Sequence, residues 1–516
     1  MWPRTNAKAL LRDHARSLRL FSNLSRPISV YSDYSGYASE IEAFSCGFQG
    51  LIEEASWTSL TSPFHFERVC DIGITQLHVL KQVSATRTSG RMCVMRDLLD
   101  HLTPAAKSHV QAMMPSSSCT AEEARHAYSD LYTWLKANRA MAFPADHKQK
   151  CLTHNQMCPV HPSRRNTTSM LANPTYITLA GVTCDGWSSV GGQARFAHAS
   201  EACHNAFVVE RMVRAEQECE DLAFVECTKT YPIAAKLRDP LSATHHTIWV
   251  TTGPELFGHP VHRRRVLGVC IAKARMARLG PISLLEVQSE FAELFYKTVM
   301  LTGGEYFCGP ESQRQEMYQH LAATQTNHIS LEELNGSAHD ISELLPEMLP
   351  VGQLQTLTQW LANRHDFESP GGELVVDLDH NFASQKRGGF LWPTQLTHGT
   401  VAHLPRGGPI RLATPLEHLA AQGYQVFTQD EMGSLGDSSG LGGANAIVSP
   451  MRQIFERLPS GKVKMLVGRG IHIVVLAAWL YYILSNVAPI HRPADLRMLR
   501  GMSLESVDSE SDEEID

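Results

Sequence analysis

The sequence predicts a mixed α/β fold, built on a parallel sheet that is covered by helices. Two observations carry this prediction. From about residue 27 to residue 272, short apolar runs with strand character alternate with helical patterns, which is the order typical of parallel sheets. The chain has 516 residues, of which 43% are hydrophobic and 19% charged. This balance is typical of a globular protein with two to three domains.

Seven apolar runs supply the expected strands. Each is short and is followed by polar or turn residues before the next helical pattern begins. They are Ile28–Tyr31, Glu67–Ile72, Met92–Met95, Tyr176–Gly181, Ala223–Glu226, Thr247–Thr251 and Val266–Ile271. A polar insertion, residues 104–170, interrupts the alternation.

The rest of the chain divides into further parts. Glycine pairs punctuate residues 273–408, and residues 301–350 are strongly acidic, so we expect a separate module there. Residues 409–488 are expected to return to the first domain, which spans residues 27–272. An acidic, disordered tail is expected at residues 489–516.

Charge is unevenly distributed along the chain. The tail from Ser503 carries seven acids and no base, which equals the formal net charge of −7, so the body is electrically neutral. The body therefore lacks the global positive charge that marks many nucleic-acid binders. Residues 1–26 hold six bases against Asp13 alone. This basic N-terminal arm either targets an organelle or contacts nucleic acid, unless it is a frayed terminus.

One stretch, residues 471–488, approaches membrane-spanning length. It contains His472, Ser485 and Asn486, and no second such stretch exists, so we interpret it as a buried helix and expect no membrane partner. The 12 cysteines are scattered and show no disulfide framework. Reduced, intracellular thiols are therefore expected.

The most informative chemical feature is a cysteine and an acid that follow neighbouring strands. Cys184 comes after the strand that ends at Gly181, and Glu226 ends the next strand along the chain. A nucleophilic thiol and an acid are the minimal equipment for adding sulfur to a pyrimidine ring and protonating that ring. Alternatively, the cysteine is a small buried hydrophobe and the acid a capping or solvated residue.

Further motifs follow one another in a fixed order, mostly at strand ends or in turns. They are Tyr34-Ser35-Gly36, Asp71, Asp97, Gly181–Ser188 around Cys184, Glu226, Pro260–Val266 with Arg263 and Arg265, Arg411–Tyr424, and Gly468-Arg469-Gly470. In this order they resemble the motifs of the cytosine-5 methyltransferases over most of the chain. The divergent methyltransferase-like proteins of dinoflagellates are the nearest match within that family.

The resemblance implies a Rossmann-like, S-adenosylmethionine-dependent methyltransferase domain with an inserted target-recognition module at residues 273–408. It assigns the nucleophile to Cys184, which needs a lowered thiol pKa, and ring protonation to Glu226, poised by burial. Arg263 and Arg265 would hold the base or support the thiol loop. The implied cofactor-binding residues are Tyr34, Ser35, Gly36, Asp71, Asp97, Gly468 and Gly470.

The implied substrate is cytosine in DNA, which would place the protein in the nucleus, with an organelle as the alternative. A tRNA substrate would use the same catalytic residues. The chain departs from the family at Ala38, Thr183, Cys227 and Arg469, where the family carries glycine, proline, asparagine and asparagine. These departures favour a third possibility, a catalytically inactive methyltransferase-like protein that binds nucleic acid or protein.

A cluster of metal-competent side chains lies inside the polar insertion. Cys151, His154, Cys158 and His161 fall within 11 residues, and cysteine and histidine are the ligands that zinc prefers. The spacing is shorter than in ordinary zinc modules. Zinc binding is therefore one hypothesis, and a polar loop with incidental thiols is the other.

Overall fold

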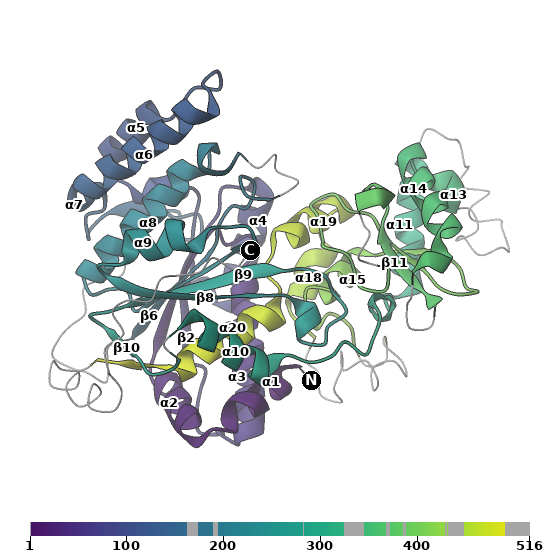
Figure 1. Ribbon diagram of the computed structural model, residues 1–516, viewed down its shortest axis with the longest axis horizontal. Coiled ribbons are helices and arrows are strands. Elements are labelled where there is room, and N and C mark those ends of the chain that lie inside the picture. The colour runs from purple at the N-terminus through teal and green to yellow at the C-terminus, as the bar shows by residue number, and fades with distance from the viewer. Residues whose placement is uncertain are drawn as a thin grey trace.

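The computed structural model describes residues 2–161, 174–188, 194–281, 283–324, 345–367, 372–384, 389–428, 431 and 448–490. Its centre is a seven-stranded sheet with the order β3-β2-β1-β6-β7-β9-β8 (Figure 1). The strands are β1 (Ile28–Asp33), β2 (Phe64–Cys70), β3 (Cys93–Met95), β6 (Thr175–Gly181), β7 (Leu222–Thr228), β8 (His245–Thr252) and β9 (Arg265–Ala272). All seven expected strands are confirmed, and the fold is Rossmann-like.

One strand differs from the expectation of a parallel sheet. β3, β2, β1, β6 and β7 pair in parallel, whereas β9 is antiparallel to both β7 and β8. Between β8 and β9 the chain forms only the short η4 (Pro254–Leu256). Because no crossover helix returns the chain to the starting edge, β9 runs back beside β8.

The two faces of the sheet are covered by different helices. Side chains alternate along β7: Leu222 and Phe224 join the large core with α3 (Ser39–Ala55) and α20 (Ile473–Ser485), and Ala223 and Val225 join a second core. The second core packs against α8 (Glu201–Glu216). Further helices are α4 (Ile74–Arg87), α9 (Asp239–Leu241), α10 (Leu284–Phe295), η1 (Leu98–His101), η2 (Arg195–Ala197) and the π-helical η3 (Ala234–Arg238).

The N-terminal residues do not form an arm. They fold into α1 (Trp2–Leu11) and α2 (His14–Leu24), which pack against α3 and α20. The Asn23 side-chain amide donates to the carbonyl oxygens of Leu484 and Val487 at 2.7 and 2.9 Å. Arg16 forms an ion pair with Glu290 on α10. The basic side chains that suggested an arm therefore belong to an amphipathic pair of helices in the main domain.

The apolar stretch near the C-terminus is a core helix. Every residue of α20 is buried, and the Trp479 indole lies against β9, with Nε1 3.4 Å from the Gly268 carbonyl oxygen. By length and composition, the helical stretch Ser460–Ser485 is the one candidate membrane span among the described residues, and 72% of its apolar window is buried inside the protein. Such burial is typical of a core helix.

The polar insertion forms helices and a β-hairpin on the side of the sheet that α8 covers. It contains α5 (Pro104–Met113), α6 (Ala121–Ala137), α7 (Arg139–Ala142), β4 (Lys148–Lys150) and β5 (Met157–Pro159). α6 begins with a capping box between Thr120 and Glu123 and packs its apolar face on α8.

The second module has its own core and lies at the opposite end of the molecule from α5 and α6 (Figure 1). Its elements are α11 (Glu311–Thr324), α13 (Leu345–Met348), α14 (Val351–Ala362), η7 (Arg364–Asp366), η9 (Phe382–Ser384), β11 (Leu374–Asp377), β12 (Val401–Leu404) and β13 (Arg411–Leu412). The second module begins later than the expected residue 273. The residues just after 273 still belong to the main domain, because α10 packs on β8, and β10 (Met276–Arg278) pairs with β14 (Val487–Pro489).

Between this module and the sheet lie α15 (Pro415–Ala420), α18 (Met451–Glu456) and α19 (Ser460–Arg469) (Figure 1). η5 (Gly303–Tyr306) contacts β11 and α15. α15 starts at the capping box of Thr414 and Glu417, inside the predicted motif Arg411–Tyr424. The tail beyond residue 490 lies outside the described residues.

Candidate active site

The topology places a ligand crevice at the carboxyl ends of β1 and β6. The chain moves outward from β1 to β2 and β3 and then returns to the other side of β1 as β6. Ligands bind at such a switch point in open α/β sheets. The loops that follow the two strands meet there: a β-carbon built on Gly181 would lie 3.4 Å from the Tyr34 carbonyl oxygen.

The loop after β1 has an unusual backbone. Tyr34, Gly36 and Ala38 have positive φ angles of 54°, 57° and 65°. Two of these residues carry a β-carbon, so the loop holds strain of the kind that concentrates at ligand sites. Ala38 thus has a left-handed conformation that glycine adopts at less cost.

Asp71 organises this loop. Its Oδ2 accepts the Gly36 backbone N–H at 2.9 Å, and its Oδ1 accepts the Gly73 N–H at 2.9 Å. Burial raises the pKa of Asp71. Because each carboxylate oxygen can accept more than one hydrogen bond, Asp71 holds the glycine loop in place and retains capacity for a ligand hydroxyl.

Ser35 and Asp97 also have partners within the protein. The Ser35 hydroxyl donates to the Ser32 carbonyl oxygen and accepts the Cys70 N–H, both at 3.0 Å, which ties β1 to β2. Asp97 caps η1 by accepting the Leu99 N–H at 3.0 Å. Ser35 and Asp97 therefore lie at the predicted edge of the sheet, but the hydrogen bonds of their side chains support the protein backbone.

Gly468 and Gly470 lie where the second module meets the crevice. A β-carbon on Gly470 would lie 2.2 Å from the Tyr37 hydroxyl, and one on Gly468 would lie 2.6 Å from the backbone of Leu396 and Thr397. The Arg469 carbonyl oxygen comes within 3.8 Å of a β-carbon built on Gly36. The structure therefore brings Gly36, Gly468 and Gly470 together, and close packing explains both C-terminal glycines.

Of the two predicted catalytic residues, Glu226 lies on β7, and Cys184 lies in the loop after the neighbouring strand β6. Glu226 on β7 is the register partner of Gly181 on β6, and the Val182 N–H donates to the Glu226 carbonyl oxygen at 3.1 Å. Cys184 follows two residues later and is half-buried. Burial raises the pKa of the Cys184 thiol, the nearby Glu226 raises it further, and Arg265 and Arg263 oppose this rise. The expected lowered pKa of the thiol is therefore wrong, because the effect of burial outweighs that of the arginines.

The two predicted arginines have different surroundings. The Arg265 Nε lies 3.0 Å from the Glu226 Oε1. Arg263 is buried and donates to backbone carbonyl oxygens, to Gly470 at 2.5 Å and to Gln395 at 3.3 Å. Burial lowers the pKa of Arg263 to about 10. Arg265 thus pairs with the Glu226 carboxylate. Arg263 holds the loop at Gly470 against the second module.

A small cavity lies at the switch point, with about 230 Å³ of empty space that is partly open to solvent. Its lining residues are Tyr34, Val182, Thr183, Trp187, Ser200, Glu201, His204 and Tyr231. Sequence motifs did not indicate Glu201, which pairs with the buried Lys236, or His204, whose Nε2 lies 3.1 Å from the Tyr231 hydroxyl.

Glu40, in the first turn of α3, was also missed from the sequence. Its side chain is 2% exposed, and its Oε1 is buried with no hydrogen-bond partner among the described residues. Burial raises the pKa of Glu40 to about 7, and the nearby Asp71 adds to the effect. A buried carboxylate beside the glycine loop is suited to face a cationic group.

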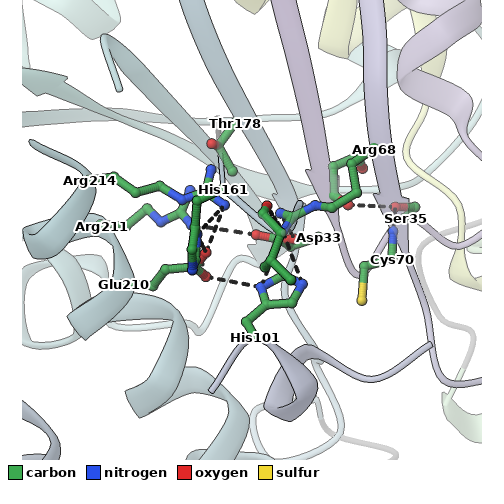
Figure 2. Close-up of polar contacts among 12 residues, drawn as sticks. Asp33, Ser35, Arg68, Cys70, His101, His161, Thr178, Glu210, Arg211 and Arg214 are labelled. Carbon is green, nitrogen blue, oxygen red and sulfur yellow. Dashed lines mark hydrogen bonds and ion pairs between the residues drawn. The ribbon is translucent and has the colours of Figure 1, made fainter. Parts of the chain in front are cut away.

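His161 lies apart from the other predicted zinc ligands. Figure 2 shows it in a buried ion-pair network, where Glu210 contacts His161 at 3.3 Å, His101 at 3.2 Å and Arg214 at 2.7 Å. The assignment of His161 to a metal cluster is therefore wrong, since the chain leaves the hairpin and turns toward α8. Asp33 in this network is paired with Arg68 at 2.6 Å.

The arginines already supply positive charge to the network, so it offers a poor site for a cation. Cys151, His154 and Cys158 do come together, with Cys93 from β3 beside them.

No protein-family profile and no curated protein matches the chain. Solved structures that resemble it include the Dnmt2 methyltransferase of S. pombe, with 11% identity and a TM-score of 0.38, covering 89% of this chain and 98% of that one. The Entamoeba histolytica methyltransferase EhMeth has 10% identity and a TM-score of 0.39, covering 89% and 98%. A Spodoptera frugiperda DNMT2 mutant has 10% identity and a TM-score of 0.35, covering 89% and 99%.

Proposed function

We propose that this chain is an S-adenosylmethionine-dependent methyltransferase that methylates carbon 5 of cytosine through a covalent adduct with Cys184. One observation carries the proposal. At the switch point of the sheet, the glycine loop after β1 meets the Cys184 loop after β6, and Glu226 with its partner Arg265 stands on the adjacent strands.

The acidic side chains at the crevice are of a type that can bind S-adenosylmethionine. Acids Asp71 and Asp97 follow β2 and β3, where such folds bind ribose and base. Glu40 presents an unpartnered buried oxygen beside Asp71, which would favour a cation such as a sulfonium or an amino group. The cofactor supplies an electrophilic methyl group. Because the cavity is small, binding requires the loops around Tyr34 and Thr183 to separate.

The chemistry explains the pairing of a thiol with an acid. The Cys184 sulfur adds to C6 of the ring while N3 gains a proton. The electron pair of C5 then attacks the methyl carbon, and the carbon–sulfur bonding electrons leave with the cofactor sulfur. Loss of the C5 proton to a base, expulsion of the thiolate and deprotonation of N3 restore the ring.

The proton that N3 gains can come from the Cys184 thiol, and water takes the proton that C5 loses. The raised pKa of Cys184 keeps the thiol protonated at neutral pH, and the Glu226 carboxylate is paired with Arg265. The thiol proton can therefore pass through Glu226 to N3, so that the thiolate forms only as the ring accepts the proton. Because a thiol must approach the face of the ring, a base in a duplex would have to leave its stack.

DNA is the proposed substrate, and tRNA is the alternative, since the same residues would act on either. The second module reaches the crevice at Gln395, whose carbonyl oxygen accepts from Arg263, and Arg263 also donates to the Gly468 carbonyl oxygen. This contact suits a role of the module in positioning the nucleic acid. Mass spectrometry of nucleosides from DNA and from tRNA, each incubated with the protein and S-adenosylmethionine, tests the choice. 5-Methylcytosine in DNA supports the proposal, and its appearance in tRNA alone assigns the alternative.

A second candidate, an inactive methyltransferase-like binding protein, is favoured by the small cavity and the protonated thiol. Calorimetry with S-adenosylmethionine separates the two candidates. Binding that is weakened in Asp71→Ala supports the enzyme, because that carboxylate holds the glycine loop. The expected loss is about 1 to 3 kcal/mol, the usual range for hydrogen bonds to a charged group. Absence of binding to the folded parent favours the inactive protein.

A further inference from the structure

Four metal-competent side chains converge at one edge of the sheet. Cys93 begins β3, and Cys151, His154 and Cys158 come from the hairpin of β4 and β5. Their ligand atoms all lie within 4.8 Å of one another. The Sγ atoms of Cys93, Cys151 and Cys158 are each 3.4 Å from the His154 Nδ1.

These distances match a tetrahedron around one zinc ion. Zinc bonds of about 2.3 Å to sulfur and about 2.0 Å to nitrogen put neighbouring sulfur and nitrogen ligands about 3.5 Å apart. We propose that Cys93, Cys151, His154 and Cys158 form a structural zinc site. The site is independent of the proposed methyltransferase function. Compared with the ligand set predicted from the sequence, Cys93 takes the place of His161. Cys93 lies 58 positions before Cys151, the first ligand of the hairpin.

The histidine is oriented for metal binding. The His154 Nε2 lies 3.0 Å from the Gly90 carbonyl oxygen. Since a carbonyl oxygen only accepts hydrogen bonds, Nε2 carries the proton and Nδ1 presents its lone pair to the three sulfurs. A hydrogen bond of this kind, on the nitrogen opposite the metal, is the usual support of a ligating histidine.

The backbone holds the cysteines in register with β3. The Cys151 N–H donates to the Gln156 carbonyl oxygen at 2.9 Å, and the Leu152 N–H donates to the Val94 carbonyl oxygen at 2.8 Å. Asn155 has a φ of 52°, which lets the hairpin turn tightly between His154 and Cys158. The ligand set is therefore arranged by protein contacts that do not involve the ligand atoms.

Four protein ligands leave no open coordination position, so the site is structural and not catalytic. β3 is the edge strand of the large sheet, and the hairpin belongs to the insertion. Zinc would fasten the insertion to this edge at the amino end of β3. The carboxyl end of the same strand leads to Asp97 in the candidate active site.

The test is metal analysis of the full chain, purified without chelator. We expect about one zinc per chain in the parent. Cys93→Ser and Cys158→Ser should each lose it, and Cys70→Ala, which changes a buried cysteine in the same apolar cluster, should keep it. Full zinc in Cys93→Ser would overturn the proposed ligand set, as would a folded parent that purifies without zinc and binds none when zinc is supplied.

A second measurement covers variants that fail to fold. Cobalt exchanged into the parent should give visible bands of tetrahedral coordination and a thiolate-to-metal charge-transfer band. Thiol alkylation followed by peptide mass spectrometry should show Cys93, Cys151 and Cys158 protected until a chelator is added. Absence of the charge-transfer band, or a disulfide between two of the three cysteines in freshly purified protein, would contradict the site.

Discussion

The Arg265 guanidinium lies 3.0 Å from the Glu226 carboxylate, at the carboxyl edge where β7 meets β9. The adjacent arginines point elsewhere: Arg263 to backbone carbonyl oxygens and Arg264 to Glu255 at 2.7 Å. Among three consecutive basic residues, Arg265 therefore sets the position of the acid. In the proposed reaction, this pair directs a proton to the ring nitrogen.

Arg265→Ala should slow methyl transfer. Loss of the partner frees the Glu226 side chain, and we expect a decrease of roughly a hundredfold, the lower limit for general acid catalysis. Single-turnover kinetics with saturating cofactor measures it. Arg264→Ala is the matched control, because that side chain is 51% exposed and its partner is Glu255, so its rate should stay near that of the parent. Equal rates in all three proteins would remove Arg265 from the reaction.

Glu40 should make folding stability depend on pH. Burial raises the pKa of Glu40 to about 7 in the folded protein, from its ordinary value of 4.5, so folding favours the protonated form. The stabilisation is full below pH 4.5 and is lost as pH rises through about 7, a change on the order of 3 kcal/mol. Glu40→Gln stays neutral and should escape this loss.

Urea unfolding at pH 5 and pH 8 tests the effect of Glu40. The difference between the two pH values should be smaller in Glu40→Gln than in the parent. Glu53→Gln, at an exposed position of the same helix, is the control and should behave as the parent. An identical pH dependence in the Glu40 variant would show that this carboxyl group does not titrate in a buried state.

Ala38→Gly should cost the protein less stability than the same change at Ala43. Ala38 has a φ of 65°, a conformation that costs a residue with a β-carbon about 1 to 2 kcal/mol, and glycine would relieve this cost. The extra freedom of glycine in the unfolded chain offsets about 0.4 to 1 kcal/mol of the relief. Loss of the buried Ala38 methyl group offsets about 0.8 kcal/mol more, so the net change in urea unfolding should be close to zero. Ala43→Gly, a buried position inside α3, should destabilise by about 1 kcal/mol or more. Equal destabilisation by both changes would rule out strain at Ala38.

Cys184 should react slowly with an alkylating reagent at neutral pH. Burial and the Glu226 charge raise its thiol pKa, so the reactive thiolate is scarcer than in a free cysteine. The alkylation rate, followed by peptide mass spectrometry, should keep rising above pH 9. Glu226→Gln removes one cause of the raised pKa and should speed the reaction at neutral pH. A rate that levels off below pH 7 would indicate a thiolate already formed in the free protein.

The sheet could be predicted because its strands are local apolar runs, and the order of the motifs placed the Gly36, Cys184 and Glu226 loops at one edge. The direction of β9 could not be predicted, because an antiparallel return depends on the connection after β8 and not on the strand itself. The N-terminal helices were predicted as an arm because the acid that pairs with Arg16, Glu290, lies far away in the sequence.

Long-range contacts also limited the prediction of individual sites. Cys93 carries no motif of its own and reaches the metal cluster only because β3 borders the insertion. His161, close to Cys158 in sequence, instead lies 3.3 Å from Glu210 on α8. The raised pKa of Cys184 depends on how deeply its loop is buried, and the local sequence does not predict this burial.

The most direct test of the central claim uses DNA that contains 5-fluorocytosine. Its ring has no C5 proton to lose, so after methyl transfer the sulfur adduct cannot be released. With S-adenosylmethionine present, the parent should form a denaturant-resistant complex, whereas Cys184→Ser should bind both ligands and form none. A complex formed equally by the serine variant, or no complex from a parent that binds both cofactor and DNA, would contradict a covalent mechanism through Cys184.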